Sequence, residues 1–200
     1  MLPFTVILAM WLIKSFELVM GVELGWLGVY PRKLAGMFGI LTAPLIHGSI
    51  GHLASNSISF VMLGAALVFF YPKVALKVFV RIYLLSGLLV FIFGRQVFHI
   101  GASGLVFGFA FFLFWSGIFR KDMASLAVAL LVSFFYGSMI WGIFPLEQGI
   151  SWESHLFGGL VGSIYAYVYR KIDPPDQPSF IDNPDEEINI EYRTYRCATT

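Results

Sequence analysis

Charged residues and cysteine are scarce in this chain of 200 residues. Asp, Glu, Lys and Arg make up only 12% of the sequence, whereas soluble domains carry about 25%. The single cysteine, Cys197, excludes an internal disulfide and a cysteine-based metal cage. A formal net charge of +1 with no basic arm gives no support for nucleic-acid binding. We therefore expect no metal ion, no cofactor and no nucleic-acid partner.

Apolar residues dominate instead, at 58% of the sequence with a mean hydropathy of +0.79. A bilayer core takes about 20 mostly apolar residues per helix. The pattern predicts an all-α polytopic membrane protein with six transmembrane helices, at residues 2–20, 52–71, 74–93, 103–119, 123–143 and 154–169. Lys14 and Glu17 interrupt the first segment, and their three-residue spacing lets them pair on one helix face.

The chain divides by composition into a six-helix membrane domain, residues 1–170, and a polar tail, residues 171–200. Seven of the twelve acidic residues follow Lys171, and the tail is rich in proline. This composition predicts a disordered extension, with a short docking peptide as the alternative. The connection between the first two helices is about thirty residues long and too apolar for a free loop. We expect it to lie in the membrane interface.

Lys and Arg residues indicate the orientation, because cytoplasmic connections carry an excess of them. One set of connections holds Lys73, Lys77, Arg120, Lys121, Arg170 and Lys171, and the other holds Arg32, Lys33 and Arg95. This bias predicts that both termini are cytoplasmic. The second, fourth and sixth helices then start at the outer face, and all four histidines (His47, His52, His99 and His155) fall near that side.

Three polar clusters begin those helices. His52 and Asn56 are four residues apart and share a helix face. Ser103 lies between Gly101 and Gly104, and His155 precedes Gly158 and Gly162. Gly104 with Gly108, and Gly158 with Gly162, form two small-xxx-small faces that let helices approach closely in lipid. Such packing would bring Ser103 and His155 to one depth.

A hydroxyl beside an imidazole is the minimum for an activated serine nucleophile, with His155 as general base and later general acid. Free N–H groups at the helix start near Ser103, together with His52 and Asn56, suit a developing oxyanion. A packing role is the alternative for each residue alone, since serines in membrane helices commonly bond to the preceding turn.

At these residues the chain resembles the rhomboid family of intramembrane serine proteases. Its motifs match His47, His52 and Asn56, then Gly101, Ser103 and Gly104, then His155, Gly158 and Gly162. The resemblance implies a Ser103–His155 dyad without an acidic third member. It also implies an oxyanion site formed by His52, Asn56 and the backbone of Ala102, with His47 supporting the loop. Phe107 stands where many members have a tyrosine that stacks on the catalytic histidine.

The resemblance further implies an integral membrane endopeptidase that cleaves single-span membrane proteins near the outer face. We expect the membrane to be a bacterial inner membrane. Substrate is expected to enter past the fifth helix, under connection 144–153, in which Glu147 and Glu153 are expected to be solvated. Two alternatives stay open: an inactive chaperone or binding protein on the same scaffold, and a small transporter with a histidine proton relay. The oligomeric state stays open as well.

Overall fold

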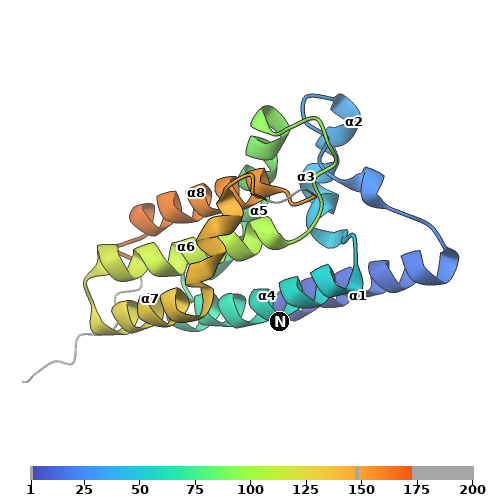
Figure 1. Cartoon of the computed structure of the whole chain (residues 1–200). Helices are drawn as coiled ribbons and strands as arrows, with labels where there is room; N and C mark the ends of the chain where they lie inside the picture. The colour runs from blue at the N-terminus through green and yellow to red at the C-terminus, as the bar shows by residue number, and fades with distance from the viewer. Residues whose placement is uncertain (1, 147–148, 173–200) are drawn as a thin grey trace, which may run out of the picture.

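The computed structural model describes residues 2–146 and 149–172, and its regular elements there are helical apart from one isolated bridge between Val29 and His99 (Figure 1). The long helices are α1 (Leu2–Met20), α4 (Ile50–Phe70), α5 (Ala75–Phe93), α6 (Ser103–Arg120), α7 (Met123–Tyr136) and α8 (Trp152–Val168). The short ones are η1 (Gly25–Leu27), α2 (Leu34–Met37), α3 (Gly39–Thr42), η2 (Ala43–Leu45) and η3 (Gly137–Ile143). Most of the predicted tail, from residue 173 on, lies outside the described residues, and so does Glu147.

Four of these helices are long and apolar enough to cross a membrane within the described ranges: Ile50–Phe70, Ala75–Phe93, Ser103–Arg120 and Met123–Ile143, the last being α7 continued by η3. They coincide with the second to fifth predicted segments to within two residues at each end. Helix α8 has 17 residues, which span about 25 Å at 1.5 Å per residue, less than the ~30 Å hydrocarbon core. The count of six spans therefore stays a prediction.

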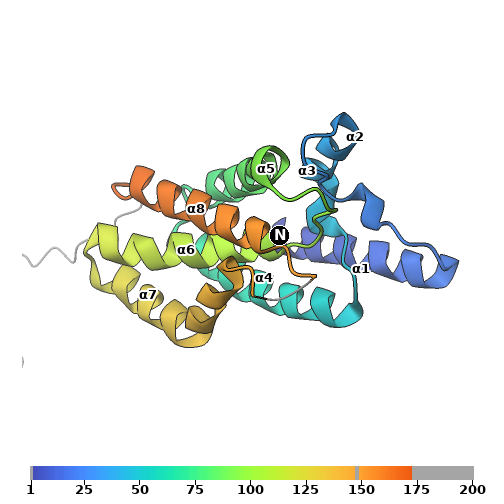
Figure 2. The ribbon, with the colours of Figure 1, turned by 45° about the horizontal axis from the view of Figure 1, so that its top comes forward.

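Helix α6 lies at the centre of the bundle, with α4, α5, α7 and α8 around it (Figures 1 and 2). Within its spanning window 67% of the residues are buried, against 17–33% for the other three spans. The outer helices thus present most of their apolar side chains to the surroundings, as lipid-facing helices do. Because Ser103 is the first residue of α6, the central helix carries the predicted nucleophile.

Glycines set the distance between α6 and α8, which pack more extensively than any other pair of elements. A Cβ atom on Gly158 would overlap the carbonyl oxygen of Gly104, and a Cβ atom on Gly162 would overlap that of Gly108. Only glycine leaves room for such contact between two helix backbones, and small residues at these positions are typical of membrane helix pairs. The predicted glycine packing is confirmed.

The connection between α1 and α4 is tied down by the charged pair in α1. Lys14 Nζ lies 3.1 Å from Glu17 Oε2, as the spacing predicted, and also donates to the carbonyl of His47 at 2.9 Å. Glu17 accepts from the backbone N–H of Leu24 at 2.7 Å. The C-terminal half of α1, which carries this pair, extends beyond the start of α4 (Figures 1 and 2). The pair therefore anchors both ends of the connection.

Large apolar side chains of the same connection are exposed: Trp26 by 63%, Leu34 by 81% and Phe38 by 75%. Water would not favour this exposure, whereas the apolar part of a bilayer interface would. The predicted interfacial position of the connection agrees with this pattern and stays a prediction.

Substituting Gly162 by Val should separate α6 from α8, because the new side chain meets backbone rather than a movable side chain. We expect a loss of about 1–3 kcal/mol of stability, the usual cost of overpacking, seen as a lower midpoint of thermal unfolding in detergent. The matched control is Gly51→Ala, where the nearest atom to a new Cβ lies 4.0 Å away. Equal midpoints for the two variants would contradict the proposed role of the α6–α8 contact.

Candidate active site

Ser103 and His155 meet where α6 and α8 begin. The Nε2 atom of His155 lies 2.8 Å from Ser103 Oγ. Ser103 opens α6, and His155 stands in the first turn of α8. The two residues are 8% and 9% exposed, so their bond is shielded from bulk water. The predicted contact between hydroxyl and imidazole is confirmed as geometry. Their common depth in a membrane stays a prediction.

The second nitrogen of the His155 ring also has a partner. Its Nδ1 lies 2.8 Å from the carbonyl oxygen of Gly142, in η3. A carbonyl oxygen can only accept, so in the neutral ring Nδ1 carries the proton and Nε2 accepts from the Ser103 hydroxyl. Sequence reasoning missed Gly142, because a backbone carbonyl leaves no signal in a residue pattern.

Phe107 covers one face of the same imidazole. The two ring centroids are 4.1 Å apart and the rings are tilted by only 5°. Phe107 lies four residues after Ser103 and therefore on the same face of α6, one turn along. A phenylalanine thus stacks on the imidazole without a tyrosine hydroxyl.

His52 and Asn56 of α4 converge on Gly101, just before Ser103. Ser49 caps the helix by accepting from the N–H of His52, which sets the first turn of α4. A Cβ atom on Gly101 would lie 2.8 Å from His52 Cε1 and 3.6 Å from Asn56 Nδ2. Gly101 has φ +106°, which an L side chain rarely adopts. Position 101 therefore requires glycine, because its φ angle disfavours a side chain and because a Cβ atom would lie too close to His52.

The side-chain amide of Asn56 is buried, with 6% of the residue exposed. Its Nδ2 has no hydrogen-bond partner among the residues that the structure describes. Buried polar groups are nearly always paired, and an exception calls for a reason. A donor held ready beside Ser103 suits an oxyanion that forms only during a reaction.

His47 supports the loop, as the family resemblance implied. Its Nε2 accepts from the N–H of Ala102 at 3.3 Å, and its ring packs edge-on against His52 with centroids 5.1 Å apart. Burial, with a smaller contribution from the charge of His52, lowers the pKa of His47 to about 4. His47 is therefore neutral at physiological pH and able to accept. Because the N–H of Ala102 is engaged here, an oxyanion role for Ala102 stays a prediction.

Glu153 is not solvated, and that prediction is wrong. The residue is 2% exposed, and its carboxylate accepts from Arg95 at 2.5 Å (Nε to Oε1) and 3.0 Å (Nη2 to Oε2). Arg95 belongs to the connection before α6, whereas Glu153 belongs to the first turn of α8. The pair ties the segment before Ser103 to the start of the helix that carries His155.

His99 strengthens the same junction. Its Nδ1 lies 2.6 Å from Ser151 Oγ, and its Nε2 lies 2.9 Å from the carbonyl oxygen of Arg95. Backbone bonds join His99 to Val29 in both directions. Burial is the largest cause lowering the pKa of His99. The residue therefore links three segments: the first connection, the α5–α6 connection and the start of α8.

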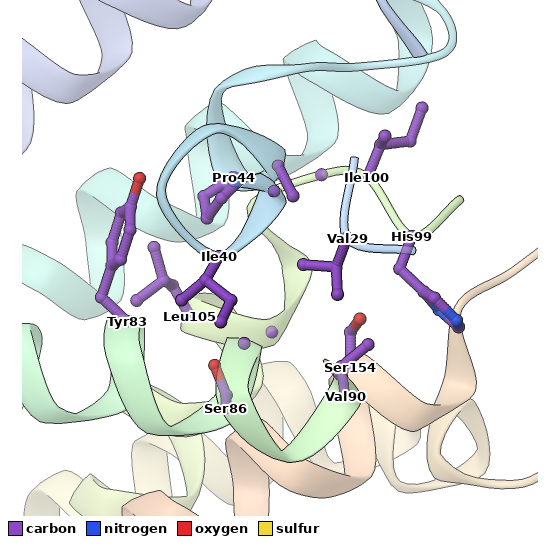
Figure 3. A pocket seen from close by; sticks show the side chains of 15 residues that line it. Val29, Ile40, Pro44, Tyr83, Ser86, Val90, His99, Ile100, Leu105 and Ser154 are labelled. Atoms are coloured by element: carbon purple, nitrogen blue, oxygen red, sulfur yellow. The ribbon is translucent and has the colours of Figure 1, made fainter. Parts of the chain in front are cut away.

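A small cavity of about 30 Å³ lies between the first connection, α5 and the start of α6 (Figure 3). Ile40 and Pro44 of the first connection face Ser86 and Val90 of α5 across it. This volume is enough for a water molecule. Neither Ser103 nor His155 lines it, but their neighbours Gly101, Gly104 and Ser154 do, so the cavity adjoins the candidate active site without containing the dyad.

Comparison with protein-family models matches residues 35–172 to the Rhomboid domain. Two similar proteins, from Mycobacterium tuberculosis and Mycobacterium bovis, are each 33% identical over 177 residues, covering 82% of this chain and 72% of theirs. A protein of Mycobacterium leprae is 29% identical over 150 residues, covering 70% of this chain and 59% of its own. All three carry the description "uncharacterized protein".

The family match covers more than half of the chain and includes α4 to α8, which carry every residue of the candidate site from His52 to His155. The family match and the four helices apolar enough to span a bilayer together establish the kind of protein and its family. The chain is an integral membrane protein that belongs to the rhomboid family.

Proposed function

We propose that this chain is an intramembrane serine endopeptidase, in which Ser103 is the nucleophile and His155 the general base. The observation that carries the proposal is the 2.8 Å contact between Ser103 Oγ and His155 Nε2. The proton on Nδ1, held by the Gly142 carbonyl, leaves Nε2 free to accept from the hydroxyl. A nucleophile, a base within reach and a group that orients the base form the pattern of covalent hydrolases.

In the proposed reaction, Nε2 takes the hydroxyl proton while Oγ attacks the carbonyl carbon of the substrate. The negative charge then moves to the substrate oxygen, where Asn56 Nδ2, His52 and the first N–H groups of α6 can donate. In a site of low dielectric, one such donor lowers the barrier by about 2.7–4 kcal/mol. His155 gives its proton to the leaving amine, and an acyl-enzyme on Ser103 remains. Water, deprotonated by His155, then releases the second product.

The proposed substrates are single-span membrane proteins cleaved near the outer face. In this arrangement α1 and α8 complete six spans, both termini are cytoplasmic and the membrane is a bacterial inner membrane. The packing of α8 along α6 supports a common depth for the two helices (Figure 2). A packed helix hides its carbonyl groups within its own hydrogen bonds, so the substrate must unwind locally before Ser103 reaches it.

Removing either member of the dyad should abolish cleavage. Ser103→Ala and His155→Ala, purified and reconstituted in liposomes with a single-span substrate, should each lose activity while keeping the thermal midpoint of the parent. A fluorophosphonate probe should label the parent at Ser103 and fail to label either variant. Ser163→Ala is the matched control, since its hydroxyl donates to the carbonyl of Gly159 within the same helix.

Cleavage by Ser103→Ala would refute this mechanism. A folded parent that binds membrane substrates but never reacts with the probe would instead indicate a binding protein or chaperone on the same scaffold.

Truncating Asn56 should slow the chemical step without weakening substrate binding. We expect Asn56→Ala to lower kcat by about 10²–10³-fold, the usual effect of deleting one oxyanion donor, with KM changed little. Ser55→Ala, at the exposed neighbouring position, should behave like the parent. Steady-state kinetics on a quenched substrate in detergent give both constants. If kcat is retained, Asn56 has no place in the oxyanion site.

A further inference from the structure

We propose that the backbone carbonyl of Gly142 fixes the tautomer of His155, so that η3 is a positioning element of the catalytic base. The inference rests on the proposed function, because it assigns the group that orients the base of that same dyad. The role is carried by an atom of the main chain, and it places part of the catalytic geometry on the C-terminal end of the α7–η3 span.

Both ring nitrogens of His155 are in hydrogen-bond contact, each at 2.8 Å: Nδ1 with Gly142 O and Nε2 with Ser103 Oγ. If Nε2 carried the proton, Nδ1 would present a lone pair to a carbonyl oxygen, and two acceptors would face each other. The carbonyl therefore selects the Nδ1–H form. Once Nε2 has taken the serine proton, the same bond stabilises the positive ring, because bonds to charged groups are stronger.

The end of η3 makes this carbonyl available. The last carbonyl groups of a helix have no partner within it, and Gly142 is the second-last residue of η3. Phe144, which follows η3, is already extended at φ −102° and ψ 151°. A helix continuing through Phe144 would use these carbonyl groups for its own bonds. Termination of the span at this point is thus what turns the Gly142 oxygen towards His155.

Glycine is also the residue that fits at position 142. A Cβ atom there would lie 3.1 Å from His155 Nδ1 and 2.8 Å from Cζ of Phe107. Those two rings are stacked, so a side chain at 142 would push apart the imidazole and the ring that covers it. The absence of a side chain lets the backbone approach the histidine directly.

An apolar pocket of about 280 Å³ lies between α6 and the span that supplies the carbonyl. It is lined by Phe111 and Trp115 of α6 and by Tyr136, Met139 and Ile140 of α7 and η3. Atoms that border such a space have fewer packing contacts than atoms in a filled interior. A shift of η3 would break the bond to Nδ1 and release the preference for the productive tautomer.

A neutral acceptor suits this depth. In soluble serine hydrolases a carboxylate orients the histidine, but a buried charge within a membrane is costly. The nearby carboxylate of Glu153 is already bound by Arg95. The Gly142 carbonyl orients the His155 ring, as a carboxylate does in those enzymes, but it places no charge beside the dyad.

The test weakens the carbonyl of Gly142 as an acceptor and changes no side chain. It also removes the N–H of residue 143, and the control variant loses one backbone N–H of η3 in the same way. Replacing Ile143 by its α-hydroxy acid turns the 142–143 peptide bond into an ester, whose carbonyl is a poorer acceptor. The full chain is reconstituted in lipid, and kcat and KM are measured on a single-span substrate. Nitrogen NMR of ¹⁵N-histidine reports the tautomer, with His155→Ala identifying the signal. The matched control places the ester at Ile140, also in η3, and weakens the carbonyl of Met139 instead.

We expect the ester at 143 to lower kcat about three- to tenfold, the effect of weakening one hydrogen bond, with KM unchanged. The His155 signal should move from pure Nδ1–H towards a mixture of tautomers, while the ester at 140 alters neither quantity. A lower kcat with an unchanged tautomer signal would overturn the inference. An Nε2–H signal in the unmodified protein would do so too, whether or not the ester variant folds.

The two proposals fail in different ways. A parent protein that neither cleaves nor reacts with a serine probe would refute the protease. Its histidine spectrum would still report whether the Gly142 carbonyl selects the tautomer.

Discussion

The close approach of α6 to α8 is the contact on which the candidate site depends. Backbone meets backbone there, because Gly158 and Gly162 face the carbonyls of Gly104 and Gly108 without a Cβ atom between them. A side chain at Gly158 or Gly162 would meet the backbone of α6 and widen the gap between the two helices, on which the contact between Ser103 and His155 depends. The packing of α6 against α8 therefore sets the geometry of the candidate site.

Charged groups lie at the rim of the candidate site, and neutral groups lie at its centre. The ion pair Arg95–Glu153 ties the start of α8 to the connection before α6. The centre uses neutral groups: a hydroxyl, an imidazole, a backbone carbonyl and the amide of Asn56. Charges are costly where lipid replaces water, so the pair lies where the arginine keeps access to solvent, with 49% of its side chain exposed. In the proposed reaction, His155 is positively charged only while it holds the proton of Ser103.

Periodicity and spacing predicted much of this from particular residues. Apolar runs located the four spans within two residues at each end, and glycines four residues apart predicted the α6–α8 contact. Lys14 and Glu17 were expected to pair and do so. Glu153 was misjudged, because a lone acidic residue in a connection reads as solvated until its partner from another segment is known. Gly142 was missed, since a glycine in an apolar span does not reveal that its carbonyl meets a histidine of another helix.

Residue patterns were enough to predict the membrane class, four of the helical spans and the polar groups at the helix starts. Hydrophobic length and residue spacing act locally along the chain, so they can be read without the fold. Only the tertiary structure decided which nitrogen of His155 faces Ser103, where Asn56 points and which charge Glu153 meets. Each of these depends on groups that lie tens of residues apart in sequence or belong to the backbone, and the folded chain alone brings them within hydrogen-bond distance.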